Sequence, residues 1–458
     1  MDLVRVDQHD LQGNILAGYG FAHALFLFVR LAAPSPGRAL LAELADQVTT
    51  AVPFDTKPAS TVNVALTHDG LRALDVPDAV LHSFPEDFRQ GMAARADKLG
   101  DSGPDSPAAW ESGLRAGEPH ALVTITAQSP DELGARRARL QTLAGADVQL
   151  VHEQAASVLT SDDGTTAREH FGFADGFAQP SIAGVAEHDP KRRVGPTARP
   201  GQGTPTGSGW KELAPGEFVL GYPDETGYEA DAPPEPLRMS GSYMVVRKLR
   251  QDVSLFHRFL HDAASGDREG ARLLAAKIMG RWPDGTPVVL ASEAAPSGPA
   301  AEPGKPENDF VYGKDPDGMR CPIGAHIRRA NPRDALGFEG QLTARHRIIR
   351  RGMPYGPPPA DPAIDDGADR GLMFVCFQAS IARQFEVVQG RWLADGDAFG
   401  LGSDGDFLLA GHDPRGKMVI PGNPPRLLGP RPAFVTNRGG GYFFAPGVAA
   451  LRALAAGI

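Results

Sequence analysis

Three stretches of the sequence combine side chains that can do chemistry in a closed pocket. In the first, residues 170–184 read HFGFADGFAQPSIAG and place Asp175 among three aromatic rings, those of Phe171, Phe173 and Phe177. A carboxylate that loses its hydration to such rings favours its protonated form, which suits a proton shuttle. The same residues also fit an Asp-Gly turn whose carboxylate caps its own backbone. Taken alone, the stretch favours the turn, because such turns are common.

The second stretch, residues 319–334, reads MRCPIGAHIRRANPRD and sets His326 just ahead of three arginines, Arg328 among them. A neutral imidazole is a good iron ligand, and guanidinium groups nearby can neutralise the propionates of a haem. Cys321 does not stand in a Cys-x-x-Cys-His pattern, so covalent attachment of a haem is not supported. The alternative is an ordinary histidine in a basic loop.

The third stretch, residues 344–358, reads ARHRIIRRGMPYGPP and contains Arg350 and Arg351 before a glycine. A guanidinium that enters a closed pocket keeps its charge and can stabilise a developing anion. A solvated basic strand end is the alternative interpretation.

The first part of the chain predicts the elements that must position these residues. Apolar runs and alternation predict strands, and 3.6-residue spacing predicts helices. The strands are expected at 21–31, 60–67, 121–127 and 148–159, and the helices at 36–48, 68–74 and 130–143. Two strand-helix-strand units in this order are typical of a ferredoxin-like sheet with helices on one face.

The second half repeats this order more loosely, although no residue-level repeat is detectable. Strands are expected at 242–246, 372–378 and 442–445, and helices at 253–264, 268–279, 380–392 and 448–456. A Gly/Pro-rich stretch separates the halves. We therefore expect an N-terminal domain at 1–190, a linker at 191–216 and a C-terminal domain at 217–458.

Composition excludes several classes of protein. With 46 Lys and Arg against 56 Asp and Glu, the 458-residue chain has a formal net charge of −10, which argues against nucleic acid as a partner. Two cysteines form no disulfide framework. The sequence shows no signal peptide, twin-arginine pair or membrane span, so a cytoplasmic protein without a membrane partner is expected. It does not determine the oligomeric state.

Together, the three stretches resemble the dye-decolorising peroxidases. The family's GxxDG signature matches residues 172–176, its proximal histidine segment resembles CPIGAHIRRANPR, and its distal arginine segment resembles HRIIRRGMPYG. Further matches are DLQGNILAGYGF near the start, KIMGRWPDGTPV at 277–288 and GLMFVCFQASIARQFE at 371–386. The resemblance covers most of the chain and is closer to the longer bacterial and fungal members than to the compact ones.

The resemblance implies an α+β fold of the dimeric α+β barrel type, built from two ferredoxin-like halves with duplicated antiparallel sheets and peripheral helices. It also implies non-covalent haem b, held mainly by the C-terminal half. His326 matches the proximal iron ligand, Asp175 the distal acid–base and Arg350, rather than its neighbour Arg351, the distal arginine. Arg328 matches an arginine that binds a propionate.

Other positions follow from the same resemblance. Leu372 and Phe374 match apolar residues that line the distal side. A carboxylate is expected to hydrogen-bond the proximal imidazole, with Asp406 as first choice and Glu386 as the alternative.

The implied activity is a peroxidase that uses hydrogen peroxide to oxidise an aromatic dye or a phenol. Since an aspartate accepts protons at lower pH than a histidine, an acidic optimum is expected. Electrons from bulky reductants are expected to cross oxidisable side chains, for which the tryptophans are candidates: Trp110, Trp210, Trp282 and Trp392. Three alternatives remain: a deferrochelatase-like protein that handles haem, a non-enzymatic haem carrier, and a metal-free binding module.

Overall fold

The computed structural model describes residues 5–144, 147–161, 164, 166–176, 178–185, 205–206, 209–210, 212–294, 308, 310–410 and 416–458. Within these residues the largest sheet has nine strands, in the order β10-β12-β9-β15-β2-β3-β1-β4, with β11 paired to β12. Its strands are β1 His23–Leu31, β2 Ser60–Leu66, β3 Ala121–Ala127, β4 Val148–Ser157, β9 Ser242–Gln251, β10 Ile349–Arg350, β11 Met353–Tyr355, β12 Gly371–Gln378 and β15 Val435–Ala445.

The sheet consists of two antiparallel halves with the same topology. In the first half the order is β2-β3-β1-β4, so that β1 lies between β3 and β4. This is the ferredoxin-like arrangement. The order β10-β12-β9-β15 repeats it in the second half. The two halves join where Phe444 of β15 pairs with Leu66 of β2. The predicted α+β fold with two ferredoxin-like halves is therefore confirmed.

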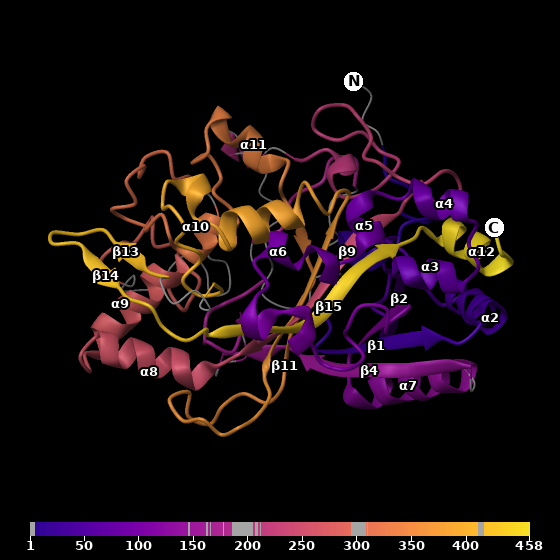
Figure 1. Ribbon diagram of the computed structural model, residues 1–458, viewed down its shortest axis with the longest axis horizontal. Helices are drawn as coiled ribbons and strands as arrows, with labels where there is room; N and C mark the ends of the chain where they lie inside the picture. Colours follow the sequence, from indigo (N-terminus) through magenta and orange to yellow (C-terminus); the bar gives the residue numbers. More distant parts are fainter. Residues whose placement is uncertain are drawn as a thin grey trace.

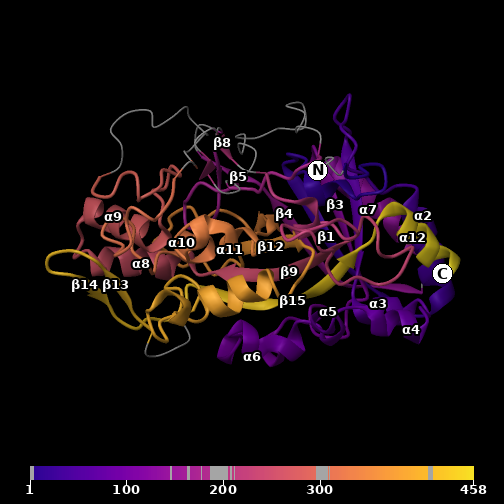
Figure 2. The same ribbon diagram turned by 90° about the horizontal axis from the view of Figure 1, so that it is seen from above.

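Helices cover the sheet and close its ends. They are α1 Gly13–Leu16, α2 Pro34–Ala45, α3 His68–Ala73, α4 Asp78–Ser83, α5 Glu86–Gln90, α6 Ala96–Leu99, α7 Pro130–Ala144, α8 Val253–Ala263, α9 Arg268–Met279, α10 His326–Ala330, α11 Gln341–Ala344, α12 Val448–Ala456 and the π-helix η7 Val387–Leu393. Figure 1 shows α2, α3, α4, α7 and α12 at one end of the molecule and α8 and α9 at the other. In Figure 2, α3 to α6 lie along one side of the sheet.

Short elements complete the described fold. Three pairs of short strands stand apart from the large sheet, and six single-turn 3-10 helices lie in the connections. The pairs are β5 Leu159–Thr160 with β6 Ala167–Arg168, β7 Pro205–Thr206 with β8 Gly209–Trp210, and β13 Met418–Ile420 with β14 Arg426–Leu428. The 3-10 helices are η1 Ala93–Arg95, η2 Gly103–Asp105, η3 Pro107–Ala109, η5 Pro215–Glu217, η6 Phe338–Gly340 and η8 Asp397–Phe399.

The sequence patterns locate most of these elements. The strand expected at 121–127 and the helices expected at 268–279 and 448–456 have those bounds in the structure. The predicted helix at 380–392 is wrong in its bounds and winding, because a turn precedes a π-helix at Val387–Leu393. Most of the expected linker lies outside the described residues, so the three domain ranges stay a prediction.

No helix in the described part of the chain has the length and apolar character that a membrane crossing requires.

Candidate active site

A cavity of about 280 Å³ lies against the second half of the sheet. Strands β9, β10, β12 and β15 form one wall of it, and residues of α9, α10 and η7 close it from other sides. Five residues that the sequence predicts for the site line this cavity together: Asp175, His326, Arg350, Leu372 and Phe374.

The imidazole of His326 is fixed by a buried carboxylate. His326 is the first residue of α10, and its Nδ1 lies 3.1 Å from Oδ2 of Asp406. The other carboxylate oxygen accepts the N–H groups of Leu408 and Leu409. Burial alone would raise the pKa of Asp406, but the His326 imidazole, with help from Arg329, outweighs it and lowers that pKa. Because Nδ1 is engaged, Nε2 is the ring nitrogen left for a metal.

Close packing against α9 sets the position of α10. Gly280 caps the C-terminal end of α9, and its φ of +91° is a left-handed conformation that favours glycine. A Cβ at this position would lie 2.5 Å from Cγ1 of Ile327, the residue after His326. The glycine therefore permits the contact that presents His326 to the cavity.

Glu386, the alternative partner of the imidazole, lies in a different network. Its carboxylate forms a buried ion pair with Arg95 and accepts a hydrogen bond from the hydroxyl of Tyr442. Glu386 does not line the cavity, whereas Asp406 contacts His326 directly.

For the haem that the sequence resemblance implies, Asp406→Asn is expected to lower affinity or turnover by about 10- to 100-fold, because partners that orient a metal-binding histidine contribute that much. Haemin titration followed by the Soret band measures the affinity. Asp404→Asn is the matched control, since Asp404 lies two residues away and pairs with Lys417. Wild-type affinity and turnover in Asp406→Asn contradict the expectation.

Asp175 and Arg350 face one another on another side of the cavity. Nη1 of Arg350 lies 3.9 Å from Oδ1 of Asp175, and the two side chains are 40% and 39% exposed. The same Oδ1 accepts the N–H of Gly176 at 2.6 Å, so the carboxylate caps its own turn as well as lining the cavity. Phe171 and Phe173 are buried. Both rings line the same cavity as Asp175, and Phe177 lies outside the described residues.

Arg350 is held at its backbone by a side-chain amide. Gln179 accepts the N–H of Arg350 at 3.0 Å and donates to its carbonyl at 3.0 Å, beside the β10–β12 pairing. Arg351 turns elsewhere, because its Nε donates to the carbonyl of Asn14 at 3.0 Å. Burial lowers the pKa of Arg351 to about 10. Arg350 is thus the member of this pair that lines the cavity.

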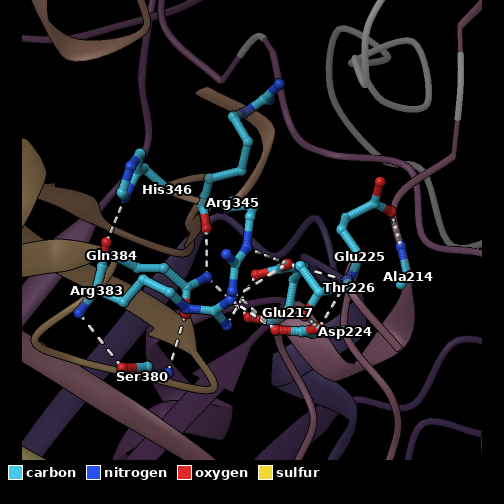
Figure 3. Close-up of polar contacts among 11 residues, drawn as sticks. Ala214, Glu217, Asp224, Glu225, Thr226, Arg345, His346, Ser380, Arg383 and Gln384 are labelled. Carbon is cyan, nitrogen blue, oxygen red and sulfur yellow. Dashed lines mark hydrogen bonds and ion pairs between the residues drawn. The ribbon is translucent and has the colours of Figure 1, made fainter. Parts of the chain in front are cut away.

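A cluster of ion pairs supports the segment that leads to Arg350 (Figure 3). Arg383 contacts the buried carboxylates of Glu217 and Asp224, and Arg345 lies 3.2 Å from Asp224. The Nδ1 of His346, which also lines the cavity, lies against the carbonyl of Arg383. These contacts hold Arg345 and His346, which precede Arg350 in the chain, against the turn at residues 381–384 before η7.

Arg328 does not line the cavity, so the expectation that it meets a propionate does not fit the structure. Its Nη1 lies 3.0 Å from Oδ2 of Asp315 and 2.7 Å from the carbonyl of Cys321, and the guanidinium stacks on Tyr312. A short helix rotates successive side chains by about 100°, and the motif alone does not show which arginine turns inward.

Other cations reach the cavity instead. Arg247, Arg281 and Arg333 all line it, and all three are buried. Among the described residues, Nε and Nη1 of Arg247 have no hydrogen-bond partner, although Nη2 pairs with Asp101. A buried cation with unused donors favours an anionic group beside it.

The residues present therefore fit a haem. An imidazole with one nitrogen free for iron, apolar walls such as Leu372 and Phe374, and buried guanidinium groups suited to propionates line the same cavity.

Glu169 also lines this cavity, and no sequence motif assigned it a role. Burial raises the pKa of Glu169 to about 7. The one available signal was its place six residues before Asp175, next to the GxxDG stretch.

The candidate electron relays differ in their surroundings. Trp110, Trp282 and Trp392 are buried, and the side chain of Trp210 lies outside the described residues. The rings of Trp392 and His346 meet edge to face, with centroids 5.1 Å apart. Trp392 is thus in contact with a residue that lines the cavity.

Comparisons with known proteins give matches over most of the chain. A family model described as the DyP dimeric alpha+beta barrel domain matches residues 10–159, and one described as Dyp-type peroxidase, C-terminal, matches residues 302–400. The chain is 30% identical over 472 residues to a dye-decolorizing peroxidase of Mycetinis scorodonius, with 97% of this chain and 86% of the relative covered. It is 32% identical over 417 residues to a multifunctional dye peroxidase of Amycolatopsis, with 86% and 82% covered.

Solved structures give the same result. A DyP-type peroxidase from Auricularia auricula-judae superposes with a TM-score of 0.82 at 25% identity, covering 99% of this chain and 100% of that one. A dye-decolorizing peroxidase in complex with 2,6-dimethoxyphenol superposes with a TM-score of 0.81 at 26% identity, covering 98% and 100%. A deferrochelatase of Yersinia pestis is 40% identical over 80 residues, which are 18% of this chain and 16% of that protein.

Proposed function

The chain belongs to the dye-decolorising peroxidase family, a family of haem enzymes, and on this premise we propose that it is a haem b peroxidase that uses hydrogen peroxide to oxidise aromatic dyes or phenols. The observation that carries the proposal is the shared cavity of His326, Asp175 and Arg350.

Residues of the cavity have distinct parts in holding the haem. Nε2 of His326 would bind the iron, and Asp406 would keep the imidazole oriented and electron-rich. Arg247 and its cationic neighbours would pair with the propionates, and Leu372 and Phe374 would exclude water. When bound, haem would supply the two electrons that break the O–O bond, and the aromatic reductant would return them.

Asp175 and Arg350 would act on the peroxide itself. The Asp175 carboxylate takes the proton from one peroxide oxygen and delivers it to the other, so that the second oxygen leaves as water. The Arg350 guanidinium stabilises the negative charge that develops as the O–O bond breaks. The distance of 3.9 Å between Nη1 of Arg350 and Oδ1 of Asp175 supports these two roles, because both groups reach the same part of the cavity.

One experiment tests the proposed function. The purified protein loaded with haem is expected to show a Soret band that changes with one equivalent of peroxide, followed by oxidation of an aromatic dye or 2,6-dimethoxyphenol. A haem carrier would show no spectral response to peroxide. A deferrochelatase-like protein would release iron to a chelator without peroxide turnover, and a metal-free binding module would bind no haem.

Arg350→Leu is expected to slow the reaction with peroxide by about 10²- to 10³-fold while haem stays bound, because removal of one charge-stabilising donor has that effect. Stopped-flow mixing with peroxide measures the rate constant. Arg350→Lys keeps a positive charge, so we expect a smaller loss. Equal wild-type rates in both variants contradict the role of Arg350.

A further inference from the structure

The carboxyl group of Glu169 bonds to the loop that carries Asp175. Its Oε2 accepts the N–H of Phe171 and its Oε1 accepts the N–H of Phe173, both at 2.9 Å. The backbone closes the same loop, because the N–H of Glu169 donates to the carbonyl of Phe173 and the N–H of Gly172 donates to the carbonyl of Glu169, both at 3.0 Å. One side chain thus satisfies two backbone donors two residues apart.

The same carboxylate ties this loop to the sheet. Nε2 of Gln251, the last residue of β9, donates to Oε2 of Glu169 at 2.6 Å. Glu169 and Gln251 both line the cavity, and β9 is the strand that also contributes Arg247 and Leu249 to its wall. The Glu169 side chain therefore fixes the position of the loop relative to the cavity wall that β9 forms.

Two backbone hydrogen bonds then fix the positions of Ala174 and Asp175, the residues that follow Phe173. The N–H of Ala174 donates to the carbonyl of Pro283, and the N–H of Asp175 donates to the carbonyl of Ala167, both at 2.9 Å. Gly172 has a φ of +98°, which lets the chain turn sharply between Phe171 and Phe173. The turn alone leaves both N–H groups without a backbone acceptor, and the Glu169 carboxylate supplies it.

We propose that Glu169 is a positioning residue that holds the GxxDG loop so that the Asp175 carboxylate meets peroxide in its reactive place. This inference rests on the proposed function, because it assigns Glu169 an effect that passes through Asp175. A misplacement of a catalytic group by about 1 Å is enough for a large loss of rate.

Glu169→Gln tests the proposal, because an amide keeps the shape but turns an NH2 group toward backbone or amide donors. We expect the rate constant for the reaction with peroxide to fall by about 10-fold or more, with the Soret band of bound haem unchanged. In an Asp175→Asn background the same substitution should change the rate less than about 2-fold, since coupled residues are not additive. Glu153→Gln, at an exposed carboxylate paired with Arg137, is the matched control.

A second readout needs no turnover and no haem. Amide hydrogen exchange at Phe171 or Phe173 should be about 10-fold faster in Glu169→Gln than in the wild type, because the amide keeps one accepting oxygen and leaves one of the two N–H groups without an acceptor. If Glu169→Gln does not fold, Gln251→Ala carries the test. It removes the bond to the sheet, and an approximately 3-fold loss of rate is expected that again disappears in the Asp175→Asn background.

The outcomes distinguish a failure of the positioning role from a failure of the proposed function. If the rate losses of Glu169→Gln and Asp175→Asn are fully additive, or if amide hydrogen exchange is unchanged at both Phe171 and Phe173, the positioning role is overturned and the peroxidase function stands. If Asp175→Asn alone leaves the reaction with peroxide unchanged, the proposed function fails at Asp175 itself.

Discussion

His326→Ala is expected to abolish stable haem binding, with a fall in affinity of at least about 100-fold, because the axial ligand contributes more than the partners that orient it. Haemin titration of the purified variant, followed at the Soret band, measures the loss. Asp406 keeps a buried charge in the variant, so we also expect the carboxylate to be destabilised without the imidazole beside it.

His346 provides the matched control, because it is the other described histidine that lines the cavity. Its Nδ1 is engaged by the neutral carbonyl of Arg383, whereas Nδ1 of His326 is engaged by the charged carboxylate of Asp406, which makes His326 the more basic of the two rings. His346→Ala should keep the haem, and free imidazole should restore the Soret band of His326→Ala by filling the space. If His326→Ala keeps a normal haem spectrum and His346→Ala loses its haem, His346 rather than His326 is the iron ligand.

Asp175→Asn is expected to slow the reaction with peroxide by about 10²- to 10⁴-fold, because an amide of the same shape accepts no proton. Haem binding should persist, since Asp175 contributes no ligand to the iron in the proposed arrangement. Stopped-flow mixing with peroxide across a range of pH measures the loss and shows whether the acidic optimum of the wild type disappears.

Asp361→Asn, at an exposed loop position, controls for the loss of a charge on the surface. An unchanged rate with peroxide in Asp175→Asn refutes the proton role. A variant that loses its haem instead assigns Asp175 to cofactor binding.

The sequence predicts the fold well where one face of an element is buried. Helix α9 shows why, since a capping aspartate, Asp267, opens it and Gly280 closes it. The predicted helix at 380–392 fails because spacing of apolar residues does not distinguish a π-helix at Val387–Leu393 from an α-helix.

The candidate site is predictable only as far as its motifs extend. Asp406 and Glu386 both follow the stretches that carry Asp175, His326 and Arg350, and only tertiary packing shows that Glu386 pairs with Arg95 and that Asp406 contacts His326. The role of Glu169 cannot be predicted from the sequence, because its partner on the sheet, Gln251, lies 82 positions away in the chain. Long-range contacts of this kind leave no local pattern.

The cavity is lined by residues from Glu169 to Val435 and needs strand β15 for its wall. A nascent polypeptide therefore lacks a complete binding surface until the ribosome has made β15. Cofactor loading should consequently wait until both halves of the sheet have been synthesised and have paired, as a maturation step on an already folded apoprotein.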